Sequence, residues 1–155
     1  MKFSSILEKK IQNKFLKNGY YIFNIRNKSN LNIIKKRIIK FSRKWLKQKS
    51  ISVKSVNYFL DNLHNYIEPK KLNEFRMFLY NEINNSKDFQ KIYYNLGKEY
   101  IDVLCGNELV MQRKCNLSIQ LPKDDSSLLP LHADVWVGDS EYELVITNIN
   151  SGNLV

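Results

Sequence analysis

Leu-Pro-Leu-His-Ala-Asp-Val-Trp-Val-Gly-Asp-Ser, residues 129 to 140, is the stretch on which the predicted fold depends. Residues 129 to 136 are typical of a β-strand, in which side chains two positions apart point to the same face. His132 and Asp134 would therefore project an imidazole and a carboxylate into the same space. These groups are two of the three ligands of a 2-His-1-carboxylate site, which binds iron(II) and leaves coordination positions open. A second histidine is expected on a later strand, but no histidine follows Asp134.

The residues on both sides of this stretch also favour β-structure. In residues 112 to 121 polar side chains take the even positions, and largely apolar side chains take the odd positions. This period of two predicts a strand with one polar and one apolar face. The polar face would present Asn116, Ser118 and Gln120 to a cavity as ligand-binding groups, or else to water. Residues 142 to 147 are predicted to form a last strand after a turn.

The first 105 residues follow a helical pattern instead. Apolar side chains recur every three or four positions in four segments, which predicts helices over residues 3 to 18, 31 to 45, 69 to 83 and 87 to 104. Ser4 or Ser5 is expected to begin the first helix and Gly19 to end it. Residues 53 to 67 also have helical spacing but are ambiguous, and residues 20 to 25 are β-prone.

The order of these elements predicts an α+β protein with one domain over residues 1 to 155. Residues 1 to 105 are expected to be mainly helical, and residues 106 to 155 to form the first antiparallel strands of a β-barrel. A jelly roll, or double-stranded β-helix, has about eight strands. Because only three or four strands are predicted, we expect the barrel to be incomplete.

Composition restricts the class of protein further. The chain has no apolar run of about 18 residues, so no membrane span is predicted. Its two cysteines and the absence of an apolar leader at the N-terminus predict a cytoplasmic protein. The net charge of +10 allows a nucleic-acid-binding function, but we expect no nucleic-acid partner. The basic residues between Lys35 and Lys47 are interpreted as a solvated helix face.

Several motifs resemble one family of enzymes. Gly106 to Leu109, Asn116 to Pro122, Asp125 to Trp136 and Gly138 to Ser140 resemble Fe(II)/2-oxoglutarate oxygenases of sporadic carbohydrate biosynthesis clusters, which are relatives of the phytanoyl-CoA dioxygenases. Tyr20 to Phe23 and Asn73 to Arg76 are similar to the same family. The resemblance covers most of the chain to about Val145.

The resemblance implies a function and a set of cofactors. It implies a double-stranded β-helix in which His132, Asp134 and a distal histidine hold Fe(II), with 2-oxoglutarate bound to the metal. Such an oxidoreductase would oxidise a C–H bond of a sugar or nucleotide-linked sugar in surface-polysaccharide biosynthesis. Asn116, Ser118 and Gln120 would then hydrogen-bond the co-substrate or the substrate.

The chain departs from the family pattern after Glu143. The Trp and Pro of the next strand are missing, and so are the distal histidine and the basic residue that anchors 2-oxoglutarate. We therefore expect a truncated, incomplete member that lacks these groups. One alternative is a non-catalytic remnant or binding module, in which His132 is a packed residue, and a second is a basic nucleic-acid-binding protein. An unfinished sheet would also leave an open edge through which copies of the chain self-associate.

Overall fold

The computed structural model describes residues 5–47, 56–106, 108–122 and 143–147, together with Trp136, Gly138 and Ser140. This part of the chain is mainly helical. Its helices are α1 (Ile6–Asn18), α2 (Lys28–Leu46), α3 (Val56–Asp61), α4 (Leu72–Asn85) and α5 (Phe89–Cys105). Two short 3-10 helices, η1 (Leu63–Asn65) and η2 (Pro69–Lys71), connect α3 to α4. None of the described helices combines the length and the hydropathy needed to cross a membrane.

The ends of α1 follow from its sequence as predicted. The Ser5 hydroxyl accepts a hydrogen bond from the backbone N–H of Glu8 at 3.2 Å, and the Glu8 carboxylate accepts one from the Ser5 N–H. This reciprocal capping box satisfies two backbone donors that a helix start otherwise leaves unpaired. At the other end Gly19 adopts a left-handed conformation with φ of +76°, which glycine tolerates because it has no Cβ.

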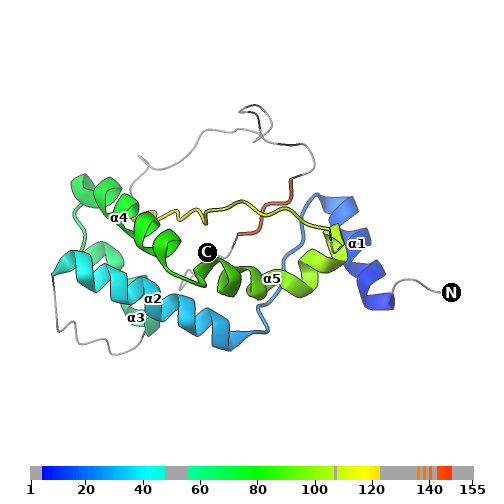
Figure 1. Cartoon of the computed structure of the whole chain (residues 1–155), viewed down its shortest axis with the longest axis horizontal. Coiled ribbons are helices and arrows are strands. Elements are labelled where there is room, and N and C mark those ends of the chain that lie inside the picture. The colour runs from blue at the N-terminus through cyan, green and yellow to red at the C-terminus, as the bar shows by residue number, and fades with distance from the viewer. Residues whose placement is uncertain are drawn as a thin grey trace.

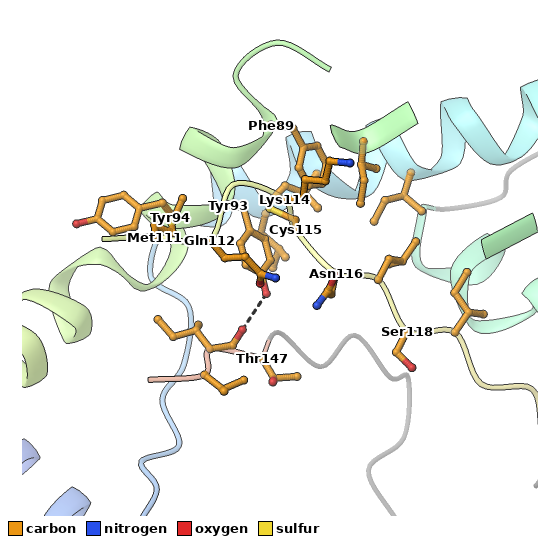
Figure 2. Close-up of a pocket in the computed structure, with 18 of the residues that line it drawn as sticks. Phe89, Tyr93, Tyr94, Met111, Gln112, Lys114, Cys115, Asn116, Ser118 and Thr147 are labelled. Carbon is orange, nitrogen blue, oxygen red and sulfur yellow. Dashed lines mark hydrogen bonds between the residues drawn. The ribbon is translucent and has the colours of Figure 1, made fainter. Parts of the chain in front are cut away.

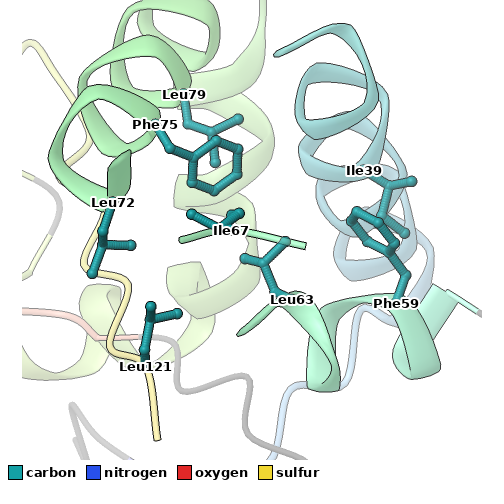
Figure 3. Packing of buried hydrophobic residues seen from close by; sticks show 8 residues of the cluster. All are labelled: Ile39, Phe59, Leu63, Ile67, Leu72, Phe75, Leu79 and Leu121. Carbon is teal, nitrogen blue, oxygen red and sulfur yellow. The ribbon is translucent and has the colours of Figure 1, made fainter. Parts of the chain in front are cut away.

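Of the two apolar clusters among the described residues, the larger lies between α2, α3 and α4. Phe75 and Leu79 of α4 are completely buried and pack with residues of α2, α3 and the following loop. Figure 3 shows this cluster, to which the later segment of the chain adds Leu121. Its buried members are Ile39, Phe59, Leu63, Ile67, Leu72, Phe75, Leu79 and Leu121.

The smaller cluster lies between α2 and the helical pair α4 and α5. Its buried members are Ile34, Ile83, Phe89 and Leu96. Ile38 and Phe41 of α2, and Leu117 of the later segment, pack against both clusters. Helices α2, α3, α4 and α5 therefore share one continuous apolar interior, and α2 contributes to both of its clusters.

The prediction of an α+β fold with antiparallel strands is wrong for the described residues, because they contain helices and no β-strand. The jelly roll is not supported for the same reason. Residues 20–25, 112–121 and 143–147 were expected to be strands, but no described backbone ladder joins them. Figure 1 shows residues 108–122 as an extended yellow trace beside α4 and α5. These residues pack against helices, and helical side chains bind their backbone groups.

Candidate functional site

Residues 115–121, called the extended segment below, alternate between buried and exposed side chains. Cys115, Leu117 and Ile119 are half-buried, and Leu121 is buried. The even positions, Asn116, Ser118 and Gln120, are exposed. A period of two is the geometry of an extended chain, so the two faces that the sequence predicts are present although no strand pairs with this segment among the described residues.

Asn84 of α4 binds one edge of the extended segment as a neighbouring strand would. Its side-chain Oδ1 accepts a hydrogen bond from the Cys115 N–H at 2.7 Å, and its Nδ2 donates to the Cys115 carbonyl at 3.0 Å. The same Nδ2 donates to the Tyr80 carbonyl at 2.8 Å, which fixes the orientation of the amide. One side chain thus satisfies both backbone groups of a half-buried residue.

Arg76 binds the same edge about two helical turns before Asn84 on α4. Its Nε donates to the carbonyl oxygen of Ile119 at 2.9 Å, and its terminal nitrogen donates to the same oxygen. The planar guanidinium is suited to this because its donors point in fixed, neighbouring directions. Asn84 and Arg76 together hold the extended segment against α4. The backbone groups of Cys115 and Ile119 that they bind point to the same edge of the segment.

The exposed face of the extended segment borders a large, partly open cavity, called the trough below. Its volume is about 1720 Å³, which exceeds the roughly 300–1,000 Å³ of ordinary ligand pockets. Figure 2 shows Asn116 and Ser118 pointing from the extended segment toward the side on which Thr147 lies. The polar groups that line it include Gln112, Asn116, Ser118, Gln120, Ser140 and Thr147.

Residues 143–147 form the opposite side of the trough. Leu144 and Ile146 are half-buried, whereas their neighbours are exposed. The Tyr93 hydroxyl of α5 donates a hydrogen bond to the Ile146 carbonyl at 3.2 Å, which Figure 2 marks with a dashed line. Ile146 also lies beside Gly97 of α5, since a Cβ built on this glycine would be in ordinary contact with an Ile146 methyl carbon at 3.7 Å.

The side of the trough that the extended segment forms has no charged groups. Residues 115–121 carry no charged side chain. Burial raises the pKa of the Cys115 thiol above its ordinary value, so the uncharged thiol is favoured. Lys114, the nearest cation in the sequence, has its ammonium 5.6 Å from the centre of the Tyr80 ring. The side chains of the extended segment are therefore suited to hydrogen bonding with the uncharged hydroxyl groups of a ligand.

The predicted iron ligands, His132 and Asp134, lie outside the described residues. Within the described ranges, no group of three or more His, Cys, Asp or Glu side chains could hold a metal ion. The expectation of a metal-binding dioxygenase built on a jelly roll is therefore not supported in this part of the chain. The described side chains therefore do not fit an iron site, and we derive no metal-dependent chemistry from them.

Three residues important to this site were not identified from the sequence as part of it. Arg76 and Tyr93 were expected within helices and Asn84 in the turn after one, although all three bind the backbone of a distant segment. A polar side chain on the inner side of an otherwise apolar helix was the available signal, since buried polar groups need partners. No family model, curated protein or solved structure matches the chain. The resemblance to the oxygenases stays a prediction.

Proposed function

We propose that the protein binds a small hydroxylated molecule, a sugar or a nucleotide-linked sugar, in the trough. The observation that supports this proposal is the projection of Asn116, Ser118 and Gln120 from the exposed face of the extended segment. Amides and hydroxyls both donate and accept hydrogen bonds, as the hydroxyls of a sugar do. The bound backbone edge holds these side chains in a row, which lowers the entropy lost when a ligand binds.

The trough also offers apolar surface beside its polar row. Leu109, Val110 and Met111 are exposed and line the cavity just before the extended segment. Specific ligand sites combine such apolar surface with a few fixed polar groups. We place this binding in the cytoplasm, a location supported by the free thiols Cys105 and Cys115.

Titration with a panel of nucleotide-linked sugars, followed by calorimetry, tests the proposal. The triple variant Asn116→Ala, Ser118→Ala, Gln120→Ala should weaken binding at least about tenfold, because each lost hydrogen bond contributes roughly 0.5–1.5 kcal/mol. The matched control Asn13→Ala, Ser29→Ala, Asn32→Ala removes similar exposed groups from α1 and α2, away from the trough. Equal affinities for the two triple variants, or no binding by the native chain, would overturn the proposal.

The second candidate function is the Fe(II)/2-oxoglutarate oxygenase, and the H-x-D spacing of His132 and Asp134 favours it. We propose these two residues as the protein's iron ligands in that case, with 2-oxoglutarate as the co-substrate. Anaerobic titration with Fe(II) should then produce an absorption band that requires 2-oxoglutarate and is lost in His132→Ala and Asp134→Ala. If the native chain gives no such band while it binds a sugar, the non-catalytic binding module is the better account.

A further inference from the structure

The extended segment has a second backbone edge, and it faces away from α4. Along an extended chain, successive residues direct their N–H and C=O groups to opposite edges. Cys115 and Ile119 direct theirs toward Asn84 and Arg76. Asn116, Ser118 and Gln120 must therefore direct theirs to the other edge. Within the described ranges, no hydrogen bond reaches the backbone groups of these three residues.

An open edge of this kind is a template for another extended chain. Its donors and acceptors are already ordered, because Asn84 and Arg76 hold the opposite edge and Leu117 and Leu121 anchor the inner face. An added strand could therefore form a ladder of backbone hydrogen bonds without the entropy cost of first ordering the extended segment. Pro122 has no N–H, so such a ladder would stop at the end of the segment.

The sequence of the extended segment is complementary to itself in one antiparallel register. With Ser118 opposite Ser118 of a second copy, Asn116 lies opposite Gln120 and amide groups meet across the pair. On the other face Leu117 lies opposite Ile119, and Cys115 lies opposite Leu121. In this register the pairs centred on the even positions are the ones that exchange both backbone hydrogen bonds. Polar side chains thus meet polar ones, and apolar side chains meet apolar ones.

The lack of charge in the extended segment is compatible with a second copy at this edge. Two chains with a net charge of +10 each repel one another, so they need a contact without cations. Residues 115–121 have no charged side chain, and in this register Lys114 lies opposite Pro122. We propose that two copies of the chain pair through the open edges of their extended segments, antiparallel, with Ser118 on the two-fold axis. The edge of a single extended segment thereby replaces the predicted edge of an unfinished sheet.

Charge substitutions at the two-fold axis test this pairing by sedimentation velocity without ligand. Ser118→Lys alone and Ser118→Glu alone each place like charges directly opposite one another, so each should shift the chain to monomers. An equimolar mixture of the two variants should restore a dimer that contains one copy of each. Ser118→Ala keeps the backbone groups and should dimerise as the native chain does.

The proposal fails if the native chain is a monomer across the concentration series. It also fails if Ser118→Lys or Ser118→Glu dimerises as the native chain does, or if their mixture does not recover the dimer. Ser118 is exposed, so both substitutions should leave the fold intact. Circular dichroism of each variant checks that the helices are intact, and one folded charge variant is enough to test the loss of the dimer. Since no ligand is present, the outcome is independent of sugar binding.

Discussion

At the scale of single residues, the side-chain amide of Asn84 has the most specific structural role. It joins α4 to a segment 31 positions later in the chain through both backbone groups of Cys115. Periodicity within a helix carries no information about a bond over that separation, so the sequence predicted the helix that ends just before Asn84 but not the partner of this side chain. The contact depends on the position of the whole segment against α4.

Asn84→Ala should lower the free energy of unfolding by about 1–3 kcal/mol, since it leaves half-buried backbone groups of Cys115 without partners. Urea denaturation measures this change. The matched control is Asn85→Ala, because Asn85 is exposed at the end of the same helix. Its effect should stay within about 0.5 kcal/mol. Equal losses for the two variants would mean that the amide contributes only helix propensity.

Tyr100 gives the protein a stability that depends on pH. Its ring is buried and stacks on Phe23 with centroids 3.9 Å apart. Burial, with a smaller contribution from the neighbouring Glu99, raises the pKa of its phenol above the ordinary 10.0. The folded state therefore holds this proton more tightly than the unfolded state. The stabilisation is complete below the unfolded-state pKa of about 10.0, and it is lost as the pH rises through the folded-state pKa.

Tyr100→Phe should consequently make stability fall less steeply above pH 10.0 than in the native chain. Urea midpoints measured at a series of alkaline pH values provide the comparison. Tyr20→Phe is the control, because the Tyr20 ring is largely exposed, and it should keep the native slope. Both cysteines remain in every variant, so the loss that arises from their raised pKa values cancels. An unchanged slope in Tyr100→Phe would contradict this account.

At the scale of elements, α5 contains a glycine that its geometry does not require. A Cβ at Gly97 would meet Phe23 at 3.5 Å and Ile101 at 3.7 Å, which are ordinary contact distances. Gly97→Ala should therefore stabilise the protein by about 0.5–1 kcal/mol through helix propensity. Gly19→Ala should destabilise it, because Gly19 has a φ of +76°. Thermal denaturation of both variants distinguishes them, and a loss of stability in both would contradict the contact geometry at Gly97.

The helices were predictable because their apolar spacing is local, whereas strand pairing is not. The capped start of α1 at Ser5 and the end of α5 before Gly106 follow from neighbouring residues. Alternation in residues 115–121 correctly indicated which side chains face inward. It did not indicate what binds the backbone, and here Asn84 and Arg76 do so in place of a strand. The same limit applies to Tyr93, whose partner Ile146 is 53 positions away.

At the scale of the whole molecule, excess positive charge opposes folding. The chain has 25 Lys and Arg residues but only 15 Asp and Glu residues. Ion pairs among the described residues, such as Arg26–Glu99, are partly exposed and contribute little. Repulsion between the remaining cations destabilises the compact state.

Raising the KCl concentration from about 10 mM to about 150 mM should therefore raise the melting temperature, because the Debye length falls from about 30 Å to about 8 Å. Differential scanning calorimetry measures the shift. In Lys36→Glu, Lys40→Glu, which lowers the net charge by four through two exposed positions of α2, the shift should be smaller. A melting temperature that falls with salt in the native chain would show that ion pairs outweigh the repulsion.

The position of α2 has a consequence for the unfolding of the protein. This helix contributes Ile34 to one apolar cluster and Ile39 to the other, and its Ile38 and Phe41 pack against both. Detachment of α2 would remove buried side chains from both clusters, so we expect the two clusters to unfold together. Cooperative unfolding of the described helices should thus depend on a few apolar side chains on the buried face of α2, namely Ile34, Ile38, Ile39 and Phe41. A mutation of Ile38 or Phe41 would weaken the packing of both clusters together.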